Sequence, residues 1–216
     1  MKQLTGLDAS FLNIETATSF GHISSLSIFG KPEDPDVNPY ELFRAQLESK
    51  LVDLEPFRRR LVEVPFGLDR PYWVNDPNFD IDFHLRHIAV PGEGTDEQLG
   101  DLVGRLIGRP MDRSRPLWEA YIIEGLPDDD FALLMKVHHS TIDGAAGAEM
   151  LAVILGVSDS GEDNWRPERL PSTGELMART AVEFARTPAK ALRLQVKALS
   201  EVGRITNTRG FNDAAN

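Results

Sequence analysis

The densest group of side chains able to transfer protons lies between Lys136 and Gly144. Two adjacent histidines, His138 and His139, are followed by Asp143, four residues beyond the second histidine. An apolar run precedes the histidines and a run of small residues follows the Asp-Gly pair, which predicts a buried strand, a turn and the start of a helix. Active-site groups are commonly carried on such turns.

Strand geometry separates the two histidines. Adjacent residues of a strand point to opposite faces, so His138 and His139 cannot both face one cavity unless the strand bulges between them. His139 has the parity of a wholly apolar set: Phe131, Leu133, Met135 and Val137. A neutral imidazole in an apolar cavity is a usable general base, because its ordinary pKa of about 6.5 is close to physiological pH. We therefore predict His139 as the base and His138 as a structural residue.

Asp143 has two candidate roles, orienting an imidazole through its second nitrogen or pairing with a cation that locks the loop. The cation could be Arg58 or Arg60, which share a face of a predicted strand, and the sequence does not choose between them. Gly144 and Gly147 leave space at the start of the predicted helix, where a narrow ligand could pass. Either a histidine or an aspartate alone is more often structural; their combination favours a function.

Several other chemistries fit the sequence poorly. The two histidines diverge and no third ligand stands at a recognised spacing, so we expect no metal site. The stretch 156–160 has Ser160 where the nucleophile elbow of a serine hydrolase needs glycine, and the chain has no cysteine. A net charge of −11 at pH 7 argues against nucleic acid as the main partner. We expect no resident cofactor.

Helices and strands interleave along the chain. Apolar periodicity and capping residues predict helices over 8–15, 39–54, 95–107 and 145–155, with Asp8, Asn38 and Thr95 as caps. Alternation and turn residues predict strands over 22–29, 57–64, 71–74, 81–88, 117–123 and 131–139. This order predicts an α/β fold, a two-layer sandwich whose mixed sheet is covered by helices on one face.

The chain divides into three predicted parts. Residues 1–157 form the compact domain, 158–173 are rich in Ser, Asp, Pro and Gly and indicate a linker, and 174–216 indicate a helical connector. No apolar stretch is long enough to span a bilayer and the N-terminus lacks the apolar region of a signal peptide, so we expect a cytoplasmic protein. The basic tail could instead lie on a lipid surface as an interfacial helix.

The string His138-His139-Ser140-Thr141-Ile142-Asp143-Gly144 matches the HHxxxDG signature of acyltransferases related to chloramphenicol acetyltransferase and to peptide-synthetase condensation domains. Three flanking stretches, 7–12, 56–61 and 112–119, resemble the bacterial wax ester synthase/diacylglycerol acyltransferases, especially the actinobacterial triacylglycerol synthases. The resemblance covers nearly the whole chain. It implies a chloramphenicol acetyltransferase-like fold and the N-terminal half of a two-domain pseudo-dimer.

The same resemblance implies transfer of a long acyl group from acyl-CoA to diacylglycerol or a fatty alcohol, in a tunnel between two similar domains. Met135, Val137 and Gly147 are the residues expected to line the tunnel. His139 would take the proton of the attacking hydroxyl, without an acyl-enzyme, while Asp143 would organise the site by pairing with an arginine. The expected partners are acyl-CoA, the acceptor lipid and a C-terminal half, without which we expect little activity. Peripheral contact with a membrane or lipid droplet also follows.

Two other functions remain open. A condensation-type enzyme would act on acyl groups bound to carrier proteins, against which the 112–119 flank argues. A non-catalytic half would keep the motif for its structure and bind lipid or a partner. Trp118, within the Pro116-Leu117-Trp118 stretch, could line a tunnel or belong to the core.

Overall fold

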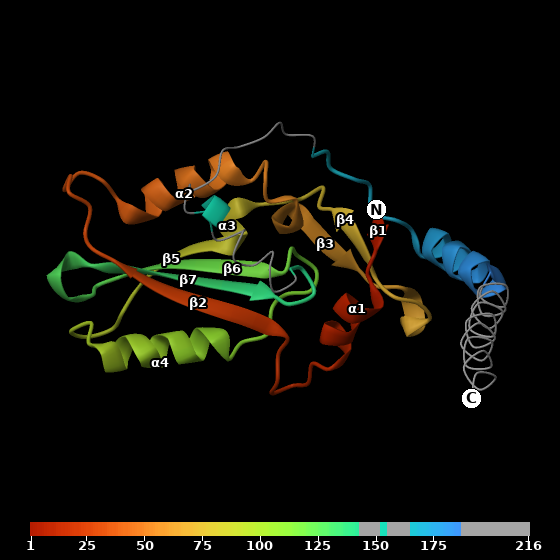
Figure 1. Ribbon diagram of the computed structural model, residues 1–216, viewed down its shortest axis with the longest axis horizontal. Coiled ribbons are helices and arrows are strands. Elements are labelled where there is room, and N and C mark those ends of the chain that lie inside the picture. The colour runs from red at the N-terminus through yellow and green to blue at the C-terminus, as the bar shows by residue number, and fades with distance from the viewer. Residues whose placement is uncertain (143–151, 155–164, 187–216) are drawn as a thin grey trace, which may run out of the picture. The chain divides into compact units, whose positions relative to one another are not determined.

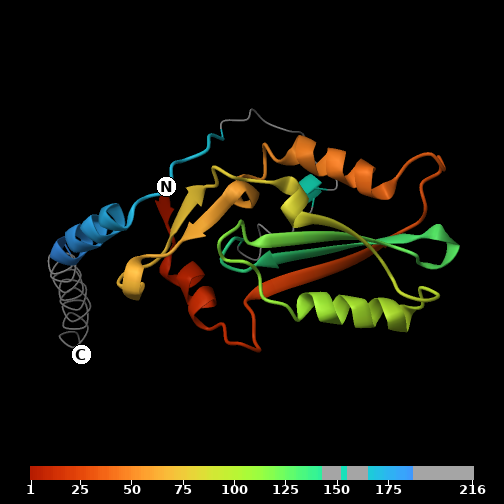
Figure 2. The same ribbon diagram turned by 180° about the vertical axis from the view of Figure 1, so that it is seen from behind.

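A computed structural model describes residues 1–142, 152–154 and 165–186 (Figures 1 and 2). The chain divides into two units, Met1–Glu63 with Arg70–Leu170 and Val64–Asp69 with Pro171–Asn216. The strands are β1 (Lys2–Gln3), β2 (His22–Phe29), β3 (Arg59–Val62), β4 (Tyr72–Asn75), β5 (Leu85–Ala89), β6 (Trp118–Glu124) and β7 (Phe131–His138). The α-helices are α1 (Gly6–Asn13), α2 (Pro39–Lys50), α3 (Ile81–His84) and α4 (Asp96–Ile107), with 3-10 turns η1 (Glu55–Arg58), η2 (Pro65–Gly67) and η3 (Pro127–Asp129).

The first unit is built on a mixed four-stranded sheet in the order β2-β7-β6-β5. Its pairs are antiparallel except β5 with β6, which are parallel. Along β2 and β7 the register runs from His22 opposite His138 to Phe29 opposite Phe131. A smaller antiparallel sheet has the order β1-β4-β3. The larger sheet therefore holds β7, the strand predicted to end in the two histidines, between two neighbours.

Helices lie on both faces of the four-stranded sheet. On one face, Leu47 and Leu51, which lie on and just beyond α2, pack in one core cluster with the β7 residues of odd number, among them Leu133. On the other, Leu99 of α4 packs in a second cluster with β7 residues of even number, among them Leu134. Figure 1 shows α2 and α4 on opposite sides of the sheet. The α/β class and the helix-covered mixed sheet are confirmed, but the expectation that helices cover one face only was wrong.

The helix α1 begins earlier than predicted, because its N-cap is an earlier residue. Thr5, not Asp8, is the N-cap: the Asp8 N–H donates to the Thr5 hydroxyl at 3.1 Å, and the Asp8 carboxylate accepts from the Thr5 N–H at 3.3 Å. This reciprocal capping box fixes the start of the helix at Gly6. The two other predicted caps, Asn38 and Thr95, are confirmed.

Two predicted strands begin with a helical turn instead. Residues 81–88 divide into α3 and β5, because the Asp80 carboxylate accepts from the Asp82 N–H at 3.0 Å and caps a turn. Residues 57–64 divide into η1 and β3, where Pro56 occupies an early helical position. Arg58 and Arg60 consequently do not share a face of one strand.

The second unit contributes one helix within the described residues, 173–186. Leu176 and Thr180 are buried on it, while Val182 and Phe184 are 48% and 62% exposed. In η2 of the same unit, Phe66 is 90% exposed and has a positive φ of 60°. The helix predicted for 145–155 lies outside the described residues except at 152–154, which are helical, and the predicted linker and connector lie largely outside them. Among the described residues, no helix has the length and apolar character needed to cross a bilayer.

Candidate active site

The turn after β7 holds His139 by its backbone and by one ring contact. Its main-chain N–H donates to the carbonyl of Gly21 at 2.7 Å, which continues the β2–β7 pairing by one residue. Its imidazole stacks on Phe11 of α1, with ring centroids 4.1 Å apart and planes 4° from parallel. Nδ1 of His139 is buried and has no hydrogen-bond partner among the described residues. The ring is thus oriented by stacking, and its buried nitrogen is not occupied by a described group.

His138 has a different environment and is 2% exposed. Its Nδ1 accepts from the main-chain N–H of Ser140 at 3.0 Å and contacts the Ser140 hydroxyl at 2.6 Å. Because a main-chain N–H can only donate, the ring proton resides on Nε2, which donates to Oε1 of Glu15 at 3.1 Å. Both ring nitrogens are therefore used to hold the turn.

Glu15 connects three segments that are distant in sequence. Its Oε1 accepts from the Gly21 N–H at 2.6 Å, and its Oε2 accepts from the guanidinium of Arg113 at 2.6 Å. Arg113 also donates to the carbonyl of Leu12 at the end of α1. No local pattern of the sequence points to Glu15 as a site residue, and Arg113 belongs only to the 112–119 flank. Their separation from His138 along the chain explains why they were missed.

Burial and charge act in opposite directions on this network. Desolvation lowers the pKa of His138, although Glu15 raises it, so the imidazole is neutral near pH 7. Burial alone would raise the pKa of Glu15, but hydrogen bonds from Arg113 and Gly21 and the nearby charges lower it overall. A neutral donor paired with a charged acceptor is the stable state of this pair.

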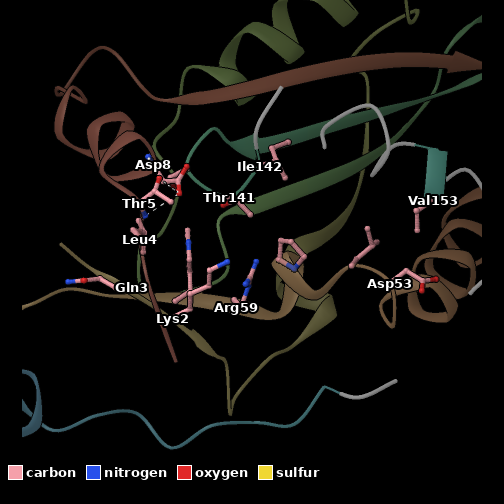
Figure 3. A pocket seen from close by; sticks show the side chains of 14 residues that line it. Lys2, Gln3, Leu4, Thr5, Asp8, Asp53, Arg59, Thr141, Ile142 and Val153 are labelled. Atoms are coloured by element: carbon pink, nitrogen blue, oxygen red, sulfur yellow. Dashed lines mark hydrogen bonds between the residues drawn. The ribbon is translucent and has the colours of Figure 1, made fainter. Parts of the chain in front are cut away.

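A cavity of about 400 Å³ lies beside the same turn. Ser140, Thr141 and Ile142 line it together with the cations Lys2 and Arg59 (Figure 3). The hydroxyl of Thr141 is buried and has no hydrogen-bond partner in the described part of the chain. His139 is not among the residues that line this cavity, so the cavity borders the turn rather than the imidazole.

The three consecutive arginines point to different places. Arg58 lies over the ring of Trp165, 4.8 Å from its centroid, and is 6% exposed. Arg60 forms an isolated bridge with Pro116 and helps to lower the pKa of Asp112, whose carboxylate mainly accepts hydrogen bonds from Ser114. Arg59 faces the cavity beside the turn, and desolvation lowers its pKa. The structure thus brings Arg59, which the sequence did not single out, next to the motif.

Trp118 belongs to the core. It is 1% exposed, its indole N–H donates to the Phe57 carbonyl at 2.8 Å, and it stacks between Phe57 and His84. His84 contacts the Trp118 carbonyl through Nδ1 at 2.8 Å, and burial lowers its pKa to about 4. Of the two interpretations of Trp118, the structure favours packing.

The remaining predicted site residues are two side chains of β7 and three residues beyond the turn. Met135 and Val137 are 4% and 7% exposed and pack in the core cluster beneath α2. Asp143, Gly144 and Gly147 lie outside the described residues. Within the described ranges, no group of three histidine or acidic side chains is arranged to hold a metal ion.

Comparison with known proteins identifies close relatives of the chain. The model of the wax ester synthase/diacylglycerol acyltransferase catalytic domain matches residues 4–211. The chain is 35% identical over 210 residues to the probable diacylglycerol O-acyltransferase tgs3 of Mycobacterium tuberculosis, covering 95% of this chain and 76% of that protein. It is 41% identical over 163 residues to tgs1 of the same species, also named a probable diacylglycerol O-acyltransferase, covering 74% of this chain and 33% of that protein.

Solved structures agree with this assignment. The wax ester synthase/diacylglycerol acyltransferase of Marinobacter aquaeolei VT8 superposes with a TM-score of 0.57 at 33% identity, over 70% of this chain and 37% of that one. A condensation domain of the calcium-dependent antibiotic synthetase has the same fold, with a TM-score of 0.54 at 19% identity, over 71% of this chain and 36% of that one. The chain thus spans about a third of the length of three of these four proteins and 76% of tgs3. It belongs to the wax ester synthase/diacylglycerol acyltransferase family of acyltransferases.

Proposed function

We propose that this chain carries the general base, His139, for transfer of a long-chain acyl group from acyl-CoA to the hydroxyl of diacylglycerol or a fatty alcohol. The observation that supports the choice of His139 is the different use of the two imidazoles. His138 spends both ring nitrogens on Ser140 and Glu15, whereas Nδ1 of His139 is buried without a described partner. A base needs a nitrogen that is not already engaged.

In the proposed reaction, His139 accepts the proton of the acceptor hydroxyl as that oxygen attacks the thioester carbonyl carbon. The carbon–oxygen bond forms, the tetrahedral intermediate collapses with cleavage of the carbon–sulfur bond, and the imidazolium returns its proton to the CoA thiolate. The Phe11 stack would hold the ring in place through both proton transfers. No covalent acyl-enzyme is required.

The decisive variant is His139→Ala, assayed together with a C-terminal half, because we expect little activity from the chain alone. We expect loss of triacylglycerol or wax ester formation, by about 100-fold or more as for removal of other general bases, with unchanged circular dichroism. The matched control is His87→Ala. His87 is 39% exposed and pairs with Glu124 at 3.1 Å. It lies on β5, the edge strand that is separated from β7 by β6. Unchanged lipid output by the folded His139 variant would favour a non-catalytic, lipid-binding half.

We further propose that a C-terminal half completes the acyl tunnel, with Met135, Val137 and Gly147 on one wall. The longer relatives support this, since the chain spans 37% of the Marinobacter enzyme. An acyltransferase assay of the chain alone and with a separately expressed C-terminal half of that relative tests the idea. Full turnover by the chain alone would contradict it, and tgs3, of which the chain spans 76%, is the natural comparison.

Contact with a lipid surface is the proposed route to the apolar substrates. Within the second unit, the exposed Val182 and Phe184 of the 173–186 helix and the exposed Phe66 of η2 are side chains suited to an interface. Sedimentation with liposomes measures the contact. Recovery of the whole protein in the supernatant at low salt would count against it.

A further inference from the structure

The outer edge of β2 is a strand edge without a partner in the described part of the chain. β2 pairs with β7 on one side and ends the sheet on the other, where Figure 1 shows it nearest the viewer. The Gly21 carbonyl accepts from His139, so odd-numbered residues of β2 direct their backbone groups toward β7. The N–H and C=O groups of His22, Ser24, Leu26 and Ile28 must therefore point away from the sheet. Together they present a complete hydrogen-bonding edge.

This edge lacks the usual protection. Natural edge strands are shortened, bulged, or carry Lys or Pro, because an open edge recruits other strands. β2 is eight residues long, and no charged residue or proline occurs between Phe20 and Gly30. Burial lowers the pKa of His22, so that side chain is neutral as well. The edge is thus open to another strand.

The exposed side chains of β2 are mostly apolar. Ile23, Leu26 and Ile28 are 43%, 41% and 56% exposed, and serines occupy the positions between them. They lie on both faces of the strand, and none of them packs in the core clusters that contain residues of α2 and α4. Adding a strand at this edge would remove part of this apolar area from water on both faces of the sheet.

Charge indicates which strand fits there. A chain with a net charge of −11 repels its own copies over most of its surface, but the strip from Phe20 to Gly30 carries no charge. A two-fold symmetric contact requires each strand to be complementary to itself. An uncharged strand satisfies that condition without placing like charges opposite each other.

One antiparallel register satisfies both the backbone and the side chains. The outward-pointing residues have even numbers, so the two-fold axis can pass through Leu26, which then faces Leu26 of the second copy. Ile23 would face Phe29, and Ser25 would face Ser27, both as close non-hydrogen-bonded pairs. β-Branched residues opposite aromatic ones and hydroxyls opposite hydroxyls are favourable cross-strand pairs. We propose that two copies of this chain associate through β2 in this register and form one continuous sheet.

Sedimentation equilibrium and light scattering test the association. We expect the mass of two chains for the native protein, and a dissociation constant at least about tenfold weaker for Leu26→Lys, because two lysines would then meet on the axis. The control is Leu42→Lys on α2, where a leucine that is 56% exposed, against 41% for Leu26, should tolerate lysine without a change in mass. Circular dichroism confirms that each variant is folded. A monomeric native protein, or a dimer unaffected by Leu26→Lys, overturns the proposal.

Single cysteines test the register, because the native chain contains none. In the proposed pairing, Cα atoms of Ser25 and Ser27 on opposite copies are about 4.5 Å apart, within the range that a disulfide spans. A mixture of Ser25→Cys and Ser27→Cys chains should therefore oxidise to a cross-linked dimer, whereas each variant alone should not. Equal cross-linking of either variant by itself would overturn the register. If the chain is monomeric and instead binds a C-terminal half of a longer relative, the proposal of a second copy at β2 is overturned.

Discussion

At the scale of single residues, Gly21 is as closely constrained as the histidines. A Cβ atom at this position would lie 2.9 Å from Nε2 of His138 and 3.0 Å from the Phe11 carbonyl oxygen. The Gly21 carbonyl and N–H also hold His139 and Glu15. Because glycine has no side chain, the backbone at Gly21 can lie close to both the His138 ring and the Phe11 carbonyl of α1.

We expect Gly21→Ala to lower the free energy of unfolding by about 1–3 kcal/mol, because the added methyl group must displace His138 or α1. Urea unfolding measures this effect, and activity should fall with it. The matched control is Gly100→Ala in α4, where a Cβ meets no atom within 4 Å. That change should instead stabilise the protein by up to about 1 kcal/mol through helix propensity. A Gly21 variant as stable as the native protein would refute the close approach.

Glu15 should affect the rate through His138. Glu15→Ala removes the acceptor of the His138 Nε2–H and leaves Arg113 without its shorter ion pair. We expect about 1–3 kcal/mol less stability and a lower kcat, with KM little changed, because the turn that carries His139 is held less firmly. Glu15→Gln can still accept hydrogen bonds from the Gly21 N–H and the His138 Nε2–H, so it should recover part of the loss.

Glu63→Ala is the control for the Glu15 variants. Glu63 is the other acidic neighbour of Arg113, at 3.4 Å, but its side chain is 63% exposed. Exposed pairs contribute about 0–1 kcal/mol, so we expect little change in stability or rate. If both variants lose kcat equally, Arg113 rather than the Glu15–His138 contact is responsible.

Part of this histidine site was predictable from the sequence. The separation of His138 from His139 followed from strand parity, which is a local property of β7. Their partners could not be predicted in the same way, because Glu15 is 123 residues from His138 and Arg113 is 98 residues from Glu15. Contacts at such separations depend on the packing of α1 against the sheet.

At the scale of secondary structure elements, the buried Lys136 links β7 to the C-terminal end of α4. Its ammonium group is fully buried and donates to the carbonyls of Leu106 and Arg109 at 3.1 and 2.7 Å and to Glu119 at 3.3 Å. A cation at the C-terminal end of a helix also interacts favourably with the negative end of the helix dipole. Desolvation lowers its pKa, although Glu119 raises it. Lys136 therefore fixes α4 to the sheet.

We expect Lys136→Met to lower the free energy of unfolding by about 3–5 kcal/mol, because Glu119 would be left as a buried charge without its cation. Adding Glu119→Gln should recover part of that loss, since the uncompensated charge is then removed. Lys31→Met is the control: its pair with Asp129 spans 3.5 Å between side chains that are 62% and 87% exposed. Urea unfolding of the native protein, the two single variants Lys136→Met and Glu119→Gln, their double variant and Lys31→Met checks the prediction. Additive effects of Lys136→Met and Glu119→Gln would refute it.

The boundaries of helices were predictable where a capping residue marks the start of the helix. They were less predictable where a stretch has both strand-like alternation and a helix cap. Asn38 and Thr95 cap the helices as their spacing predicts. Residues 81–88 alternate like a strand, but the Asp80 cap and the contact of His84 with the Trp118 carbonyl stabilise a helical turn at their start. The second of these interactions joins residues 34 apart and has no local signature.

At the scale of the whole molecule, the α/β class was predictable because helices and strands alternate in the sequence. The placement of helices on both faces of the sheet was not, since β7 has apolar residues on both parities, with Lys136 and His138 at the end of the even set. Leu133 and Leu134 are neighbours in sequence, yet they pack in separate clusters, with residues of α2 and α4. A strand covered on both sides has no alternation from which to infer one exposed face.

Buried histidines should also make the stability of the whole protein sensitive to mild acid. Burial lowers the pKa of His84 from 6.5 to about 4, and desolvation lowers the pKa of His138 and His22 as well. Each is protonated more readily in the unfolded chain, so acid favours unfolding. The stabilising contribution of His84 is complete above pH 6.5 and is lost as the pH falls from there toward its folded pKa near 4.

We expect the free energy of unfolding to decrease by about 2 kcal/mol between pH 7 and pH 5 from His84 alone, at 1.36 kcal/mol for each unit of pKa difference. Urea titrations at several pH values measure the slope, and the range above pH 5 avoids most of the carboxylate titrations. His84→Gln keeps a side-chain donor for the Trp118 carbonyl but cannot titrate, so its stability should vary less with pH than that of the native protein. An identical slope in the two proteins would show that His84 is protonated equally in the folded and unfolded states, which its burial among Phe79, Phe83 and Trp118 argues against.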